Sequence, residues 1–152
     1  MSHSKRALAV SLLVVLTSAA VMAQPDPAGV VTAASVQAVL RGKFTAESPE
    51  PGVVNYSEVD GARRVVSVYI SEGDARKLSG IRDQAVSEGE TVDAISALGE
   101  DAMYRARHNE ATGVIHDASG VSFLVSVAVQ GAESAEATKK LATELVIRAV
   151  KK

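Results

Sequence analysis

VSFLVSVAV, at residues 121–129, is the stretch that decides the fold. Its residues alternate between two sides with the two-residue period of a β-strand. Phe123 and Val125 belong to a side that is wholly apolar, whereas Ser122 and Leu124 belong to a side of mixed character. An apolar strand face must pack on other apolar groups, so this stretch predicts a strand that is covered on one side.

The segment at 134–150 predicts an amphipathic helix directly after this strand. Gly131 is placed to end the strand, and Ser134 is suited to cap the helix. We expect the apolar stripe of the helix to pack against the apolar side of the strand, because the connection between them is short. The stripe recurs at helical spacing and consists of Leu141, Ala142, Leu145, Val146, Ala149 and Val150.

The rest of the chain predicts further hairpins. Asp60 and Gly61 form a hairpin turn signal between two β-rich segments, and a second turn is expected at 117–120. Strand pairs joined by such short turns are antiparallel. The expected strands lie at 53–59, 64–70, 103–107, 114–116 and 121–129.

Helices are expected at 30–40 and 75–85, in addition to the one at 134–150. Segment 45–52, with two prolines, is expected to be a loop, and 92–98 to add a short helical stretch. The sequence therefore predicts an α+β fold. We expect a two-layer sandwich in which an antiparallel sheet of about five strands packs on two or three helices, all on its apolar face.

The N-terminus has the three parts of a secretory signal peptide. Lys5 and Arg6 precede an apolar run, and small residues at Val21 and Ala23 suit a signal peptidase. The run is shorter than a membrane span prefers, so we expect no span after cleavage. We predict a signal peptide at 1–23, a leader at 24–29 and a single domain at 30–152. An uncleaved anchor is the alternative. The predicted location is periplasmic or secreted, in a bacterium.

Composition excludes several kinds of chemistry. The 152 residues include no Cys and no Trp, which excludes disulfides, thiolate metal sites and cysteine nucleophiles. All 18 acidic residues lie beyond the predicted signal peptide, which removes Lys5 and Arg6, so the mature chain is acidic. An acidic domain with few aromatic residues is not expected to bind nucleic acid. We also find no P-loop, dinucleotide fingerprint or hydrolase elbow.

Two histidines remain after the predicted signal peptide, His108 and His116. They lie near the two ends of a segment that joins two expected strands. A metal site with nearby carboxylates is conceivable, but two ligands are fewer than a stable site needs, so we predict no metal and no cofactor. An acidic stretch that includes Glu90 is expected to be a solvated connection rather than an acid–base pair.

The candidate binding surface is the mixed face of the sheet. Arg105 and Arg107 are a basic concentration on an expected strand, and arginines suit an anion or an acidic partner. We predict that the tyrosines line the same face beside these arginines. The predicted binding residues are Tyr56, Tyr69, Tyr104, Arg105 and Arg107, and no catalytic residue is assigned.

From residue 52 to 152 the layout resembles a class of small, mostly uncharacterised bacterial exported α+β domains, many of them lipoproteins. The resemblance rests on a Tyr in the first hairpin, a Gly-Asp/Glu-x-Ala junction and a Leu-Ala-rich final helix. It implies the fold class and an envelope location, and it carries no catalytic residue. The matching residues are Tyr56, Gly99, Glu100, Asp101, Ala102, Gly120, Leu141, Ala142 and Arg148.

Three functions remain open at this point. The preferred hypothesis is an exported, non-enzymatic domain that binds an envelope protein or a small ligand through the surface just described. The first alternative is a small hydrolase or metal-dependent enzyme that uses His108 or His116. The second alternative is a structural module that forms homo-oligomers through a free sheet edge.

Overall fold

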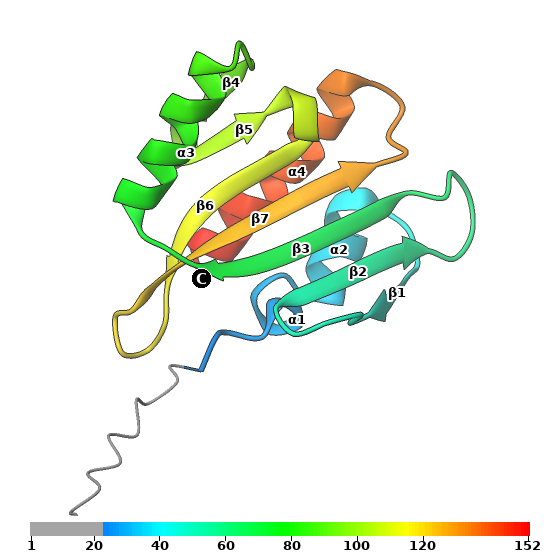
Figure 1. Ribbon diagram of the computed structural model, residues 1–152. Coiled ribbons are helices and arrows are strands. Elements are labelled where there is room, and N and C mark those ends of the chain that lie inside the picture. Colours follow the sequence, from blue (N-terminus) through cyan, green and yellow to red (C-terminus); the bar gives the residue numbers. More distant parts are fainter. Residues whose placement is uncertain (1–22) are drawn as a thin grey trace, which may run out of the picture.

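The structure is a computed structural model that describes residues 23–152 (Figure 1). The predicted signal peptide at 1–23 therefore lies, apart from Ala23, outside the described residues. Within 23–152, no helix is both long and apolar enough to cross a membrane.

One antiparallel sheet of seven strands runs through the domain, in the order β1-β2-β3-β7-β6-β5-β4. The α+β class and the antiparallel pairing are thus confirmed. The expected count of about five strands was too low because both edge strands are only four residues long. The strands are β1 (Phe44–Glu47), β2 (Val53–Glu58), β3 (Val65–Glu72), β4 (Val92–Ile95), β5 (Gly99–Arg105), β6 (Glu110–His116) and β7 (Ser122–Gln130).

The two edge strands correct two sequence predictions. β1 occupies the start of segment 45–52, which was expected to be a loop, and it pairs with β2 from Phe44 to Glu47. β4 occupies the start of segment 92–98, where helix was expected, and only Ser96–Leu98 forms a short 3₁₀ turn. Strands of four residues carry too little alternation to be distinguished from helix or loop by periodicity.

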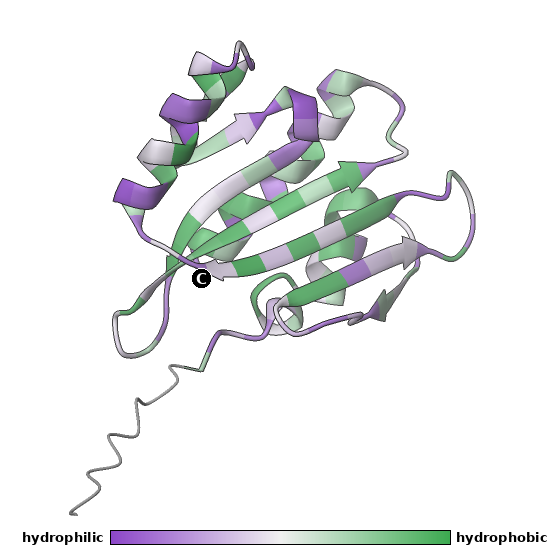
Figure 2. Cartoon of the chain, viewed as in Figure 1, coloured by the Kyte–Doolittle hydropathy of each residue, from purple (hydrophilic) through white to green (hydrophobic). Residues whose placement is uncertain are grey.

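Three helices cover one face of the sheet: α1 (Pro27–Val30), α2 (Ala33–Leu40) and α4 (Ala135–Val150). The predicted packing of the last helix on the last strand is confirmed, because Leu145 and Val146 of α4 belong to the same buried cluster as Phe123 and Val125 of β7. Figure 2 shows the alternation of apolar and polar residues along β3 and β7 that creates this face.

The remaining helix, α3 (Ala75–Ser87), lies on the opposite face of the sheet from α4 (Figure 1). Its Leu78 packs in a second, smaller cluster with Met103, Val114 and Leu124. The expectation of two layers, with all helices on one face, was therefore wrong. The mixed side of β7 carries Leu124, which pairs with Val114 on the neighbouring strand β6. These two residues belong to the apolar patch on which α3 packs.

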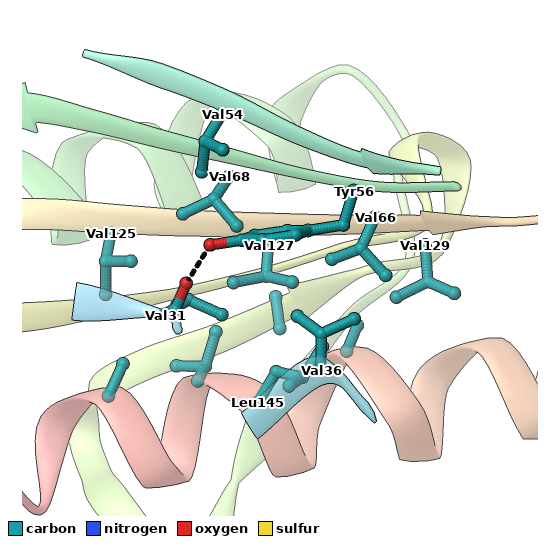
Figure 3. Close-up of a cluster of buried hydrophobic side chains, with 14 of the residues drawn as sticks. Val31, Val36, Val54, Tyr56, Val66, Val68, Val125, Val127, Val129 and Leu145 are labelled. Atoms are coloured by element: carbon teal, nitrogen blue, oxygen red, sulfur yellow. Dashed lines mark hydrogen bonds between the residues drawn. The ribbon is translucent and has the colours of Figure 1, made fainter. Parts of the chain in front are cut away.

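The main core contains Tyr56, whose ring packs among the valines of β2, β3 and β7 (Figure 3). Its hydroxyl donates a 2.5 Å hydrogen bond to the carbonyl oxygen of Val31, which follows α1. This bond ties the N-terminal segment to the sheet. The segment is also held at Gln24, whose side-chain amide donates to the carbonyl oxygen of Ile70.

Candidate functional site

The structure separates the three tyrosines that were predicted to share a surface. Tyr56 is fully buried in the core, opposite Val66 on the neighbouring strand. Tyr104 is 3% exposed and also faces the core side, where Lys139 of α4 lies 5.9 Å from its ring centroid. Only Tyr69, which is 42% exposed, lies on the open outer face. Strand alternation places Tyr56 and Tyr104 on the opposite side from Tyr69.

Burial also sets the acidity of the two buried tyrosines. Burial raises the pKa of Tyr56, and the negative charge of Asp26 raises it further. Burial raises the pKa of Tyr104 as well, although Lys139 acts in the lowering direction. Both hydroxyls therefore remain neutral and serve packing, and the prediction that they line an exposed binding surface was wrong.

The two arginines of the predicted surface do lie close to one another, on the outer side of the sheet beside α3. Arg105 ends β5 and is half-buried, whereas Arg107 lies in the 3₁₀ turn Ala106–His108, with its side chain 67% exposed. The strand predicted at 103–107 in fact ends at Arg105, because Asn109 adopts a left-handed conformation that turns the chain into β6.

The two histidines lie at opposite ends of β6 and do not meet. His116 interacts with the hydroxyl of Ser122 at 3.0 Å, whereas His108 lies 3.3 Å from a carboxylate oxygen of Glu90. Among residues 23–152 there is no group of three His, Asp or Glu side chains arranged to hold a metal ion. A site shared by both histidines is excluded by this separation.

Glu90 owes its position to the way α3 ends. The backbone N–H of Gly89 donates to Val86 at 3.0 Å, and that of Glu90 donates to Ala85 at 2.9 Å. Together these bonds form a Schellman motif, with Gly89 in the left-handed conformation that the motif requires. The residue in the position of Glu90 usually packs an apolar side chain back on the helix. Here a carboxylate is turned beneath the helix instead.

The Glu90 side chain is buried beside the end of α3. It is 5% exposed, and the carbonyl end of α3 beside it carries a partial negative charge. One oxygen, Oε1, lies 3.3 Å from His108 Nε2 and 3.8 Å from Arg107 Nη1. The other oxygen, Oε2, is buried and has no hydrogen-bond partner within the described part of the chain. A buried acceptor without a donor is destabilising.

Arg105 presents the complementary case. Its Nη2 donates to Glu110 at 2.9 Å, and the Thr112 hydroxyl donates to the same carboxylate oxygen at 3.3 Å. Thr112 in turn meets Ser126 at 2.8 Å, so a polar row crosses β5, β6 and β7. The Nε–H of Arg105, however, is buried and finds no acceptor among residues 23–152. It is a donor that remains available.

Glu90 and Arg105 line one hollow of about 350 Å³ between the end of α3 and the turn after β5. Its volume is within the range of small-molecule pockets. We call it the Glu90 hollow. Its walls are formed by Ile81, Gln84, Ala85, Glu88, Glu90, Arg105, Arg107 and His108.

A larger hollow of about 620 Å³ lies between α2, α4 and the β2–β3 turn, and two of its charged groups, Glu58 and Arg64, are paired with each other. Arg64 donates to both carboxylate oxygens of Glu58, at 2.6 and 3.0 Å, and to the Leu40 carbonyl at 2.8 Å. These hydrogen bonds from Arg64 lower the pKa of Glu58 from 4.5 to about 2. This ion pair fastens the β2–β3 turn to α2, which is a structural role.

From the sequence, Arg105 and Arg107 were assigned to the candidate binding surface and His108 only to the alternative enzyme. Glu90 was placed in a solvated acidic connection, which was wrong because its side chain is 5% exposed. The available signal was Gly89, a glycine that follows shortly after the helix predicted at 75–85. A glycine in that position implies that the next residue turns back on the helix. A glutamate there places a charged side chain where the helix-end motif favours an apolar one. Departures of this kind from local sequence preference are typical of functional sites.

No protein-family model, curated protein or solved structure matches this chain.

Proposed function

We propose that the chain is an exported, non-enzymatic domain that binds a small polar ligand in the Glu90 hollow. Export rests on the signal-peptide pattern at 1–23. Binding rests on one observation: Glu90 and Arg105 line the same hollow, and each carries a buried side-chain atom, Oε2 and Nε, that has no hydrogen-bond partner in residues 23–152.

The physical argument starts from the cost of such atoms. A buried polar atom without a partner destabilises the fold by about 1–3 kcal/mol, and more when it is charged. Domains that are marginally stable keep such groups mainly where function requires them. A ligand that supplies one donor and one acceptor removes both penalties at once, which gives it a binding advantage that an apolar molecule lacks.

Access to the hollow is provided by mobile side chains. Oε2 of Glu90 and Nε of Arg105 have almost no exposed surface, so a ligand must displace the groups above them. Arg107 and His108, whose side chains are 67% and 45% exposed, contact only the other oxygen of Glu90. Exposed side chains change rotamer readily. The hollow therefore opens without movement of the sheet or of α3.

The other two functions find less support in the geometry. An enzyme that uses His108 would place it beside Glu90, but none of the eight residues lining the hollow is a Ser, Thr, Cys or Tyr nucleophile. An oligomer formed by strand addition would use β1 or β4. Both are four residues long, and short edge strands discourage pairing with another chain.

The proposal is tested by nuclear magnetic resonance of the ¹⁵N-labelled full chain with a library of small, water-soluble, charged compounds. We expect amide shifts that cluster at residues 88–90 and 105–108. The shifts are expected to disappear in Glu90→Gln and to persist in Glu47→Gln, which alters an exposed glutamate on β1. Shifts centred on Tyr69, or no shifts at all, would contradict binding in the Glu90 hollow.

A further inference from the structure

We infer that the ligand of the Glu90 hollow is a small zwitterion: an α-amino acid with a short aliphatic side chain. This inference rests on the proposed binding function and specifies the chemistry of its ligand. It follows from the two free atoms, from the charges around them and from the apolar part of the wall.

The free oxygen of Glu90 selects a cationic donor. Oε2 is an acceptor on a carboxylate whose side chain is 5% exposed, next to the negative end of α3. Arg107 Nη1 lies 3.8 Å from Oε1, which is long for a hydrogen bond, and no side chain in residues 23–152 donates to Oε2. An ammonium group offers three donors and a full positive charge, and it fits this acceptor better than a neutral amide.

The free N–H of Arg105 selects an anionic acceptor. Its Nη2 donates to Glu110, and its Nε–H has no acceptor in residues 23–152, so Nε–H is the donor that a ligand acceptor can satisfy. Arg107 lies on the same wall with an exposed guanidinium that can close over a bound carboxylate. Arginines are well suited to this task because the guanidinium presents several N–H groups in one plane.

Size and polarity of the hollow limit the rest of the ligand. A volume of about 350 Å³ lies near the lower end of small-molecule pockets and accommodates a molecule the size of an amino acid. Ile81 and Ala85 of α3 supply the apolar part of the wall. The carboxylates of Glu88 and Glu90 share the wall with the guanidinium groups of Arg105 and Arg107, so a ligand with one charge of each sign leaves the charge balance of the hollow unchanged.

The test compares three probes that differ only in their charged groups, by calorimetric titration of the full chain. L-leucine carries both groups, 4-methylpentanoate lacks the ammonium, and 3-methylbutylamine lacks the carboxylate. We expect leucine to bind at least about tenfold more tightly than either analogue, because each lost contact is a hydrogen bond between charged groups.

Two variants assign each contact to its residue. Glu90→Gln is expected to weaken the affinity for leucine by about tenfold or more. It is also expected to reduce the ratio between the affinities for leucine and for 4-methylpentanoate. Arg105→Lys keeps a positive charge beside Glu110 but removes the Nε–H. It is expected to reduce the ratio between the affinities for leucine and for 3-methylbutylamine. Glu47→Gln serves as the control and leaves all three affinities unchanged.

The outcomes separate this inference from the proposed function. If either single-charge analogue binds in the hollow as tightly as leucine, or if only compounds other than amino acids shift its amides, the ligand is not an amino acid while the binding site stands. If no compound, leucine included, shifts the amides at 88–90 and 105–108, both the ligand class and the binding function are refuted.

Discussion

The backbone N–H of Glu90 donates a 2.9 Å hydrogen bond to the carbonyl oxygen of Ala85, and this bond turns the Glu90 side chain beneath the last turn of α3. The turn is standard backbone geometry, but the side chain it buries is not the usual apolar one. A carboxylate is thus held in the wall of the Glu90 hollow by the main chain itself. Removing the charge need not disturb the backbone that positions it.

At Gly113 of β6, α4 packs closely on the sheet. A Cβ atom at this position would lie 2.9 Å from methyl groups of both Val146 and Val150. We predict that Gly113→Ala lowers the free energy of unfolding by about 1–3 kcal/mol, because branched side chains on a packed helix cannot withdraw. Urea denaturation measures this change. An unchanged midpoint would show that α4 stands farther from β6.

Gly80 of α3 provides the opposite case. It lies inside the helix, and an added Cβ would meet no atom within 4 Å. Because glycine weakens a helix interior, Gly80→Ala is expected to raise the free energy of unfolding by up to about 1 kcal/mol. The same denaturation experiment provides the comparison. A loss of stability would mean that α3 is packed more tightly at this position than the structure indicates.

Tyr56 provides a test of the N-terminal attachment. Tyr56→Phe keeps the buried ring but removes the hydroxyl that donates to the Val31 carbonyl at 2.5 Å. The free energy of unfolding is expected to fall by about 1–2 kcal/mol, because the Val31 carbonyl is left without its donor. Tyr69→Phe, at an exposed tyrosine, is the matched control and should change stability by less than about 0.5 kcal/mol. Equal thermal shifts in the two variants would contradict the assigned bond.

The ion pair between Glu58 and Arg64 makes stability depend on pH. The pKa of Glu58 is lowered from 4.5 to about 2 by hydrogen bonds from Arg64. A lowered pKa means that the folded state binds the proton less readily than the unfolded state. The resulting stabilisation is complete above pH 4.5 and is lost as the pH falls toward 2.

We therefore predict that Glu58→Gln reduces stability at pH 7 and flattens the fall in stability between pH 4.5 and 2. Urea midpoints measured across this range provide the comparison, with Glu47→Gln as the control at an exposed glutamate. If Glu58→Gln and the unchanged protein lose stability in parallel below pH 4.5, the pair does not hold the β2–β3 turn.

The class of fold was predictable because the apolar residues of β7 and α4 recur with the clear spacing of a strand and of a helix, respectively. The alternation from Phe123 to Val129 and the stripe through Leu145 are long enough to specify a strand, a helix and their contact. The face on which α3 packs was not predictable from its own stripe. It depends on Met103, Val114 and Leu124, which come from three different strands and form a patch only after the sheet has assembled.

The candidate site was partly predictable for a similar reason. Arg105, Arg107 and His108 are adjacent in sequence, and their charges indicated a functional segment. Glu90 joins them through the pairing of β4 with β5, which brings residue 92 opposite residue 105. Tyr56 and Tyr104 were misplaced because a tyrosine fits the rim of a core as well as its interior, and only register shows which side it faces.

The stability of Glu90→Leu, measured by urea denaturation without ligand, tests the central claim most directly. Leucine restores the apolar residue that the helix end normally packs and removes a buried, half-satisfied carboxylate. If Glu90 is kept for binding, the variant unfolds at higher urea, with a gain of about 1 kcal/mol. If Glu90 instead holds the turn through His108 and Arg107, the variant unfolds at lower urea, and the Glu90 hollow is a structural joint rather than a binding site.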